Sequence, residues 1–83
     1  MSELDVRQLR KPQKHPTIFA AYRELPHGDS FVLVNNHDPK HLHEEFEADY
    51  SGSYSWEYVE SGPTVWRIRI GKPVTPAFLF AAL

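Results

Sequence analysis

The sequence predicts an α+β two-layer sandwich, in which a four-stranded mixed sheet carries two helices on one face in the order β-α-β-α-β-β. The first observation is that strand-like apolar runs alternate with segments of helical periodicity. The second is the parallel strand-helix-strand unit at the amino end, whose right-handed crossover brings both helices to one face. The third is the length of 83 residues, which allows one small domain. We expect that domain at residues 3–71 and an apolar tail at 72–83.

The first half of the chain contains two strands and one helix. Alternation at residues 3–6 predicts a short strand, which the polar stretch 7–15 ends. From Pro16, which suits a first helical turn, apolar residues recur with helical spacing as far as the turn residues 26–28. Residues 30–36 contain an unbroken apolar run, which is typical of a strand buried on much of both faces.

A second helix and a hairpin complete the order. Asp38 is expected to cap the helix and Pro39 to occupy its first turn, because this pair is a helix-start signature. Strands are predicted at 54–60 and 64–70, joined by a three-residue loop at 61–63. The alternation then pairs Tyr58 with Trp66, Trp56 with Ile68, and Glu57 with Arg67.

Composition excludes several classes of function. The absence of cysteine removes disulfides, thiolate metal sites and cysteine nucleophiles. A formal net charge of −2 creates no cationic field for DNA or for an anionic membrane. The longest apolar stretch, 77–83, is far shorter than the roughly 20 residues that span a bilayer. Residues 1–20 lack the apolar core of a secretory signal, so a cytoplasmic protein is expected. Enzymatic activity has little support, since no hydrolase or phosphate-loop motif occurs.

Histidines mark the candidate site. His15 is expected just before the first helix, and His37 with Asp38 just before the second. The carboxyl ends of parallel strands share one edge of a sheet, so these residues should converge at one rim. Helix amino ends favour an anion and neutral imidazoles there, and neutral imidazoles suit metal ligation or proton transfer. His41 is within reach of this rim if the helix starts early, whereas His43 points away.

Three readings of this rim stay open. In the first, the residues are structural: His15 is a linker residue before a proline, and Asp38 is a helix cap. In the second, His15, His37 and Asp38 bind a small ligand or an anion. In the third, His15 and His37 ligate a transition metal or haem. Elsewhere, the sheet face with Arg67 and Arg69 is either solvated or a docking surface.

The sequence resembles an uncharacterised bacterial family of small domains, DUF2249, over about residues 3–71. The residues that carry the resemblance are Leu4-Asp5-Val6-Arg7, His15-Pro16, Ile18-Phe19, the run from Phe31 to Pro39, Leu42, Phe46, Trp56-Glu57-Tyr58, Gly62-Pro63 and Trp66-Arg67-Ile68. That family is distantly similar to the sulfur carriers TusA and SirA, which share the predicted fold. Its members occur alone or joined to hemerythrin-like or cupin domains.

The resemblance implies residues and partners as well as a fold. The sulfur carriers have a Cys-Pro pair at the start of the first helix, and Lys11 stands at that cysteine's position, so persulfide transfer is not available to this chain. His15, His37 and Asp38 fall on motif positions of the closer family, whereas His41 and His43 depart from it. A hemerythrin-like or other redox protein is the implied partner.

Two functions from different classes follow. The first is a non-catalytic accessory domain that binds a small ligand, metal or haem at the rim of His15 and His37, in redox or nitrogen-oxide metabolism. The second is a protein-interaction or homodimerisation module that uses the open sheet face and the tail. A third and weaker hypothesis is acid/base catalysis by the two histidines.

Overall fold

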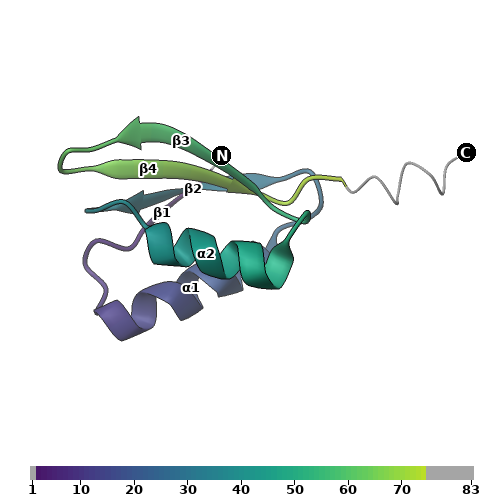
Figure 1. The fold of residues 1–83 in the computed structure, drawn as a ribbon, viewed down its shortest axis with the longest axis horizontal. Coiled ribbons are helices and arrows are strands. Elements are labelled where there is room, and N and C mark those ends of the chain that lie inside the picture. Colours follow the sequence, from purple (N-terminus) through teal and green to yellow (C-terminus); the bar gives the residue numbers. More distant parts are fainter. Residues whose placement is uncertain (1, 75–83) are drawn as a thin grey trace, which may run out of the picture.

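The computed structural model describes residues 2–74 and has the predicted element order (Figure 1). Its elements are β1 (Ser2–Asp5), α1 (Lys11–Glu24), β2 (Ser30–Asn35), α2 (Lys40–Tyr50), β3 (Ser55–Ser61) and β4 (Trp66–Gly71). The predicted tail lies, from residue 75 onward, outside the described residues. Neither helix in residues 2–74 is long and apolar enough to cross a membrane.

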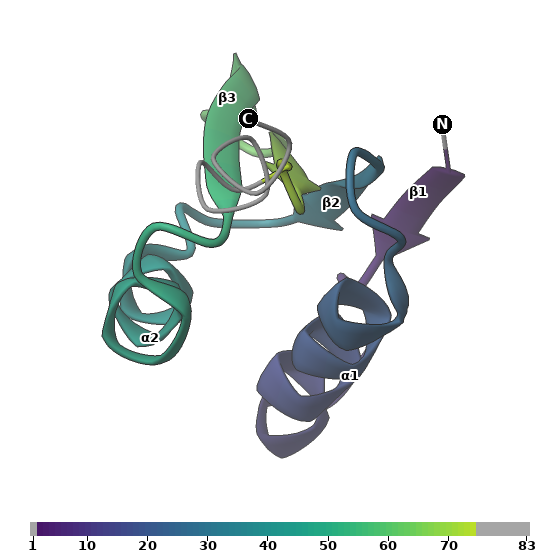
Figure 2. The ribbon, with the colours of Figure 1, turned by 90° about the vertical axis from the view of Figure 1, so that its right-hand side faces the viewer.

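The four strands form one mixed sheet in the order β1-β2-β4-β3. β1 and β2 are parallel, whereas β4 is antiparallel to both β2 and β3. Figure 2 shows α1 and α2 on the same side of this sheet. The predicted two-layer α+β sandwich is therefore confirmed.

The core lies between the sheet and the two helices. From the sheet, Phe31 and Leu33 of β2 point into it, because alternate residues of a strand share a face. Phe46 of α2 is fully buried and packs against the rings of Phe19 and Tyr22 on α1. The apolar spacing that predicts both helices thus reflects burial against the sheet.

The first helix starts earlier than expected. It begins at Lys11, with Pro12 in its first turn, and Pro16 lies inside it. The prediction that the helix begins near Pro16 is wrong, although proline suits a helix start at either position. Pro16 removes only the hydrogen bond to the carbonyl of Pro12, and both prolines are exposed, so water can satisfy that carbonyl.

The hairpin has a different register from the predicted one. Tyr58 opposes Ile68, and beyond Val59 the pairing slips by one residue, so that Glu60 opposes Arg67. Val59 is the extra residue of a β-bulge, and it is half exposed. The predicted pairs of Tyr58 with Trp66, Trp56 with Ile68 and Glu57 with Arg67 are therefore wrong. The predicted pairs assume that residues alternate regularly up to a three-residue loop. A bulge adds one residue to β3 and shifts every later pair, and the alternation of residue types does not reveal it.

The outer face of the sheet is a layer of ion pairs over buried valines. Arg69 donates to Glu57 at 2.5 Å, and Arg67 pairs with both Glu60 and Glu3. Between these strands, Val32 and Val34 on the same face are 8% and 1% exposed. Their burial is consistent with the aliphatic stems of the arginines lying over them. Both arginines are thus engaged within the domain.

Candidate functional site: a lysine pocket between two helix starts

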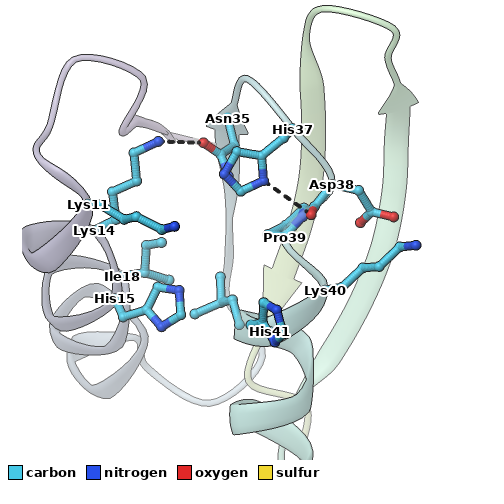
Figure 3. A pocket seen from close by; sticks show the side chains of 11 residues that line it. Lys11, Lys14, His15, Ile18, Asn35, His37, Asp38, Pro39, Lys40 and His41 are labelled. Carbon is cyan, nitrogen blue, oxygen red and sulfur yellow. Dashed lines mark hydrogen bonds between the residues drawn. The ribbon is translucent and has the colours of Figure 1, made fainter.

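A pocket of about 310 Å³ lies between the amino-terminal ends of α1 and α2, beside the carboxyl end of β2 (Figure 3). Its cationic residues are Lys11, Lys14 and Lys40, and its imidazoles are His15, His37 and His41. The remaining lining residues are Ile18, Asn35, Asp38, Pro39 and Leu42. We call it the lysine pocket. Most of its surface is nevertheless apolar, because lysine stems contribute carbon as well as charge.

The structure brings His15 and His37 to the same pocket, His37 from the expected position before α2 and His15 from a position that differs from the expected one. His15 lies in the second turn of α1 rather than before the helix, because α1 begins at Lys11. Its Nδ1 atom is 2.5 Å from Oε1 of Glu45 on α2. His37 follows β2, and its Nδ1 atom is 3.2 Å from the backbone carbonyl oxygen of Asp38. One nitrogen of each ring is therefore already engaged within the protein.

Asp38 does not cap α2. The N-cap residue is Pro39, with no side-chain cap, and the Asp38 carboxylate instead accepts a hydrogen bond from the Tyr58 hydroxyl at 2.7 Å. Burial and this hydrogen bond raise the pKa of Tyr58 above its ordinary value. The prediction of a capping aspartate is wrong because a contact from β3, distant in sequence, recruits the carboxylate.

A buried amide and a lysine form the innermost polar contact of the pocket. Asn35, the last residue of β2, is 3% exposed, and its Oδ1 atom accepts a hydrogen bond from Lys14 Nζ at 3.1 Å. Figure 3 shows this bond reaching from α1 to β2 across the open side of the pocket. Asn35 and Lys14 thus place an amide and an ammonium group side by side.

The lining contains three lysines and one carboxylate, that of Asp38, so its positive charge is only partly offset. Within residues 2–74, Lys11, Lys14 and Lys40 take part in no salt bridge, whereas the arginines of the sheet face are paired. The one carboxylate in the lining, Asp38, is bonded to a tyrosine. A chain with a net charge of −2 therefore gathers around one cavity three lysines that have no ion-pair partner among residues 2–74.

The described residues do not form a metal centre of the usual kind. In residues 2–74, no three side chains of the His, Cys, Asp and Glu types come together closely enough to hold a metal ion. His15 and His37 line one pocket but are not joined there by a third such ligand.

The other three histidines lie in three different places. His41 lines the lysine pocket, although the family resemblance counted against it. His43 points away as expected and stacks on Trp56, with ring centroids 4.2 Å apart. His27 is exposed in the turn after α1.

Sequence reasoning missed Lys14 and Asn35. Asn35 is a polar residue at the carboxyl end of a buried parallel strand, a place where ligands often bind, and this position was a usable signal. Lys14 lies in the polar stretch 7–15, which carries no helical signal, and it reaches β2 because α1 begins at Lys11.

Comparison with known proteins gives one family. Residues 3–72 match the model of a family described as an uncharacterised conserved protein family (DUF2249). No curated protein and no solved structure matches the chain.

Proposed function

The chain belongs to the DUF2249 family, and we propose that it is a non-catalytic accessory domain that binds a small anionic ligand in the lysine pocket. The family description assigns no activity, so the proposal rests on the pocket. The observation that carries it is the set of three lysines without carboxylate partners among residues 2–74, placed around a mostly apolar cavity.

Electrostatics supports an anion in this place. Like charges gathered around a cavity repel one another, so an anion that enters relieves a cost that the empty site carries. The amino ends of α1 and α2, at Lys11 and Lys40, add partial positive charge and free backbone N–H groups. A volume of about 310 Å³ stands at the lower end of the roughly 300–1,000 Å³ typical of ligand pockets, which favours a small molecule.

A metal or haem ligand receives less support. The Nδ1 atom of His15 faces Glu45, and the described residues offer no third ligand near His15 and His37. A haem group would also need a larger apolar slot than this small cavity provides. The histidines are better suited to hydrogen bonds along the wall of an anion site.

The interaction-module alternative finds no specific support in the described residues. Arg67 forms ion pairs with Glu60 and Glu3, and Arg69 forms one with Glu57. The arginines of the sheet face are therefore already paired within the domain. The apolar tail at 72–83, which the interaction hypothesis also uses, lies from residue 75 onward outside the described residues.

The proposal is tested by adding a panel of small anions to isotope-labelled protein and following backbone amide signals by NMR. We expect shifts at residues around Lys14 and His37 that weaken as salt is added. The double variant Lys11→Gln/Lys14→Gln should lose them, whereas Arg23→Gln, which removes a charge from the far end of α1, should keep them. Binding that ignores the two pocket lysines, or no response to any anion, would refute the proposal.

A further inference from the structure

Asn35 is an unusual residue for its position. It closes the central strand β2, whose preceding residue Val34 is 1% exposed, and it is itself 3% exposed. Burying an amide is costly unless its hydrogen bonds are made. Its Oδ1 atom makes one, to Lys14 Nζ. An ammonium group can only donate, so this contact fixes which end of the amide faces the lysine.

The other end of the amide is left for the pocket. The Nδ2 atom of Asn35 donates to no described residue, and it is not among the buried unpartnered atoms, so it remains in contact with solvent. Because Asn35 lines the lysine pocket, we infer that this end of its amide can donate to a ligand there. The site thus has two amide hydrogens and the remaining ammonium hydrogens of Lys14 to offer to a guest.

These donors fit a carboxylate. A carboxylate has two oxygens side by side, and one can accept from Asn35 Nδ2 while the other accepts from Lys14 Nζ. Lys11, one turn before Lys14 on α1, adds positive charge on the same side.

The rest of the lining calls for a hydrocarbon body. Ile18 lies one turn beyond Lys14 on α1, and Leu42 of α2 and Pro39 complete an apolar wall. Figure 3 shows Ile18 directly below the Lys14–Asn35 contact. Ile18 and Leu42 are each only 1% exposed, so the apolar surface open to the pocket comes mainly from the lysine stems, which a hydrocarbon group attached to the acid would cover and an inorganic anion would not.

We propose that the lysine pocket binds a small organic acid, with its carboxylate held by Lys14 and Asn35 and its hydrocarbon body placed against the lysine stems that line the pocket. This inference rests on the proposed anion-binding function and narrows its ligand class. It also assigns Asn35 as the residue that selects the carboxylate.

The test uses isothermal titration calorimetry and NMR on the full chain with three probes: hexanoate, the neutral hexanamide and inorganic phosphate. Hexanoate should bind at least about tenfold more tightly than either of the others, since only it offers both charge and an apolar body.

Two variants test the residues that are assigned to the carboxylate. Asn35→Asp keeps the shape and the contact with Lys14 but repels a carboxylate, and Lys14→Met keeps the stem and removes the charge. Each should weaken hexanoate binding by about tenfold or more, which is the typical effect of losing a charge-assisted hydrogen bond. Circular dichroism confirms that both variants fold, and Arg23→Gln is the control that should bind hexanoate unchanged.

The possible outcomes distinguish the organic-acid inference from the anion-binding function on which it rests. If phosphate binds as tightly as hexanoate and still requires Lys11 and Lys14, the pocket is an anion site but the organic-acid inference is wrong. If hexanoate binds equally well to wild type and to both variants, the assignment of Lys14 and Asn35 is wrong. If neither hexanoate nor phosphate binds, both the inference and the proposed function fail.

Discussion

Tyr58 on β3 donates a hydrogen bond of 2.7 Å to the carboxylate of Asp38, which lies in the loop before α2. The contact joins an edge strand to the loop that carries His37 and one wall of the lysine pocket. The bulge at Val59 follows directly after Tyr58. The β-bulge in the edge strand therefore lies next to Tyr58, the residue that is hydrogen-bonded to the pocket loop.

The first prediction concerns this bond. Tyr58→Phe removes the hydroxyl and leaves the ring, so we expect the free energy of unfolding to fall by about 1 kcal/mol. Urea denaturation measures that loss, and NMR should show backbone amide shifts at His37 and Asp38. If the variant unfolds at the same urea concentration and the loop signals do not move, the bond does not hold the loop.

The sequence predicts the fold well where burial sets a period. The apolar run 31–34 and the spacing of Leu42 and Phe46 predict β2 and α2, and both are confirmed because these residues are buried: Phe31 and Leu33 face the helices with Leu42 and Phe46, and the two valines lie under the outer face of the sheet. The start of α1 carries no such signal. Residues 11–13 are exposed, so no apolar period marks that first turn. The bulge at Val59 was also hidden, since glutamates on either side of it can both meet an arginine.

The site is predicted only in part, for a related reason. His15 and His37 were expected at one rim from strand and helix order, and that order does bring them to one pocket. The partners that define the chemistry are tertiary contacts: Glu45 for His15, Tyr58 for Asp38, and Asn35 for Lys14. Contacts between side chains on different elements have no period along the chain, and so local pattern does not reveal them.

The second prediction separates two costs of replacing a glycine. Gly52 and Gly62 both have positive φ, at 76° and 72°. A Cβ at Gly52 would meet no atom within 4 Å, whereas at Gly62 it would stand 2.8 Å from Cζ2 of Trp66. We expect Gly52→Ala to cost about 1 kcal/mol, for the left-handed backbone alone. Gly62→Ala should cost about 1–3 kcal/mol more, because the indole must move. Urea unfolding of both variants measures the difference, and equal losses would mean that Trp66 yields without cost.

The third prediction concerns alkaline pH. Burial and the hydrogen bond to Glu47 raise the pKa of Tyr54 to about 12 in the folded protein, above the value of about 10 in an unfolded chain. A raised folded pKa means that folding favours the neutral hydroxyl. Its contribution to stability is therefore complete below about pH 10 and is lost as pH rises from 10 to 12.

Tyr54→Phe isolates this effect, because the variant has no hydroxyl to ionise. We expect the stability of wild type relative to Tyr54→Phe to fall above pH 10, measured by urea unfolding at several pH values. The other tyrosines are common to both proteins, so their ionisation cancels in the comparison. Parallel pH profiles for the two proteins would contradict the raised pKa of Tyr54.

The fourth prediction concerns the aromatic centre of the core. Phe46 is fully buried and contacts the rings of Phe19, Tyr22 and Trp56. Phe46→Ala should cost about 3–5 kcal/mol, through lost apolar burial and the cavity left behind. A domain of this size has roughly 4–12 kcal/mol of total stability, at about 0.05–0.15 kcal/mol per residue, so the loss is a large part of it. Tryptophan fluorescence during urea unfolding reports the change, since one of the two tryptophans, Trp56, has its ring centroid 5.9 Å from that of Phe46. Glu44→Ala, at an exposed position of the same helix, should alter the free energy of unfolding by less than about 0.5 kcal/mol. A loss of under about 1 kcal/mol in Phe46→Ala would show that the aromatic rings repack around the gap, and that no single residue centres this core.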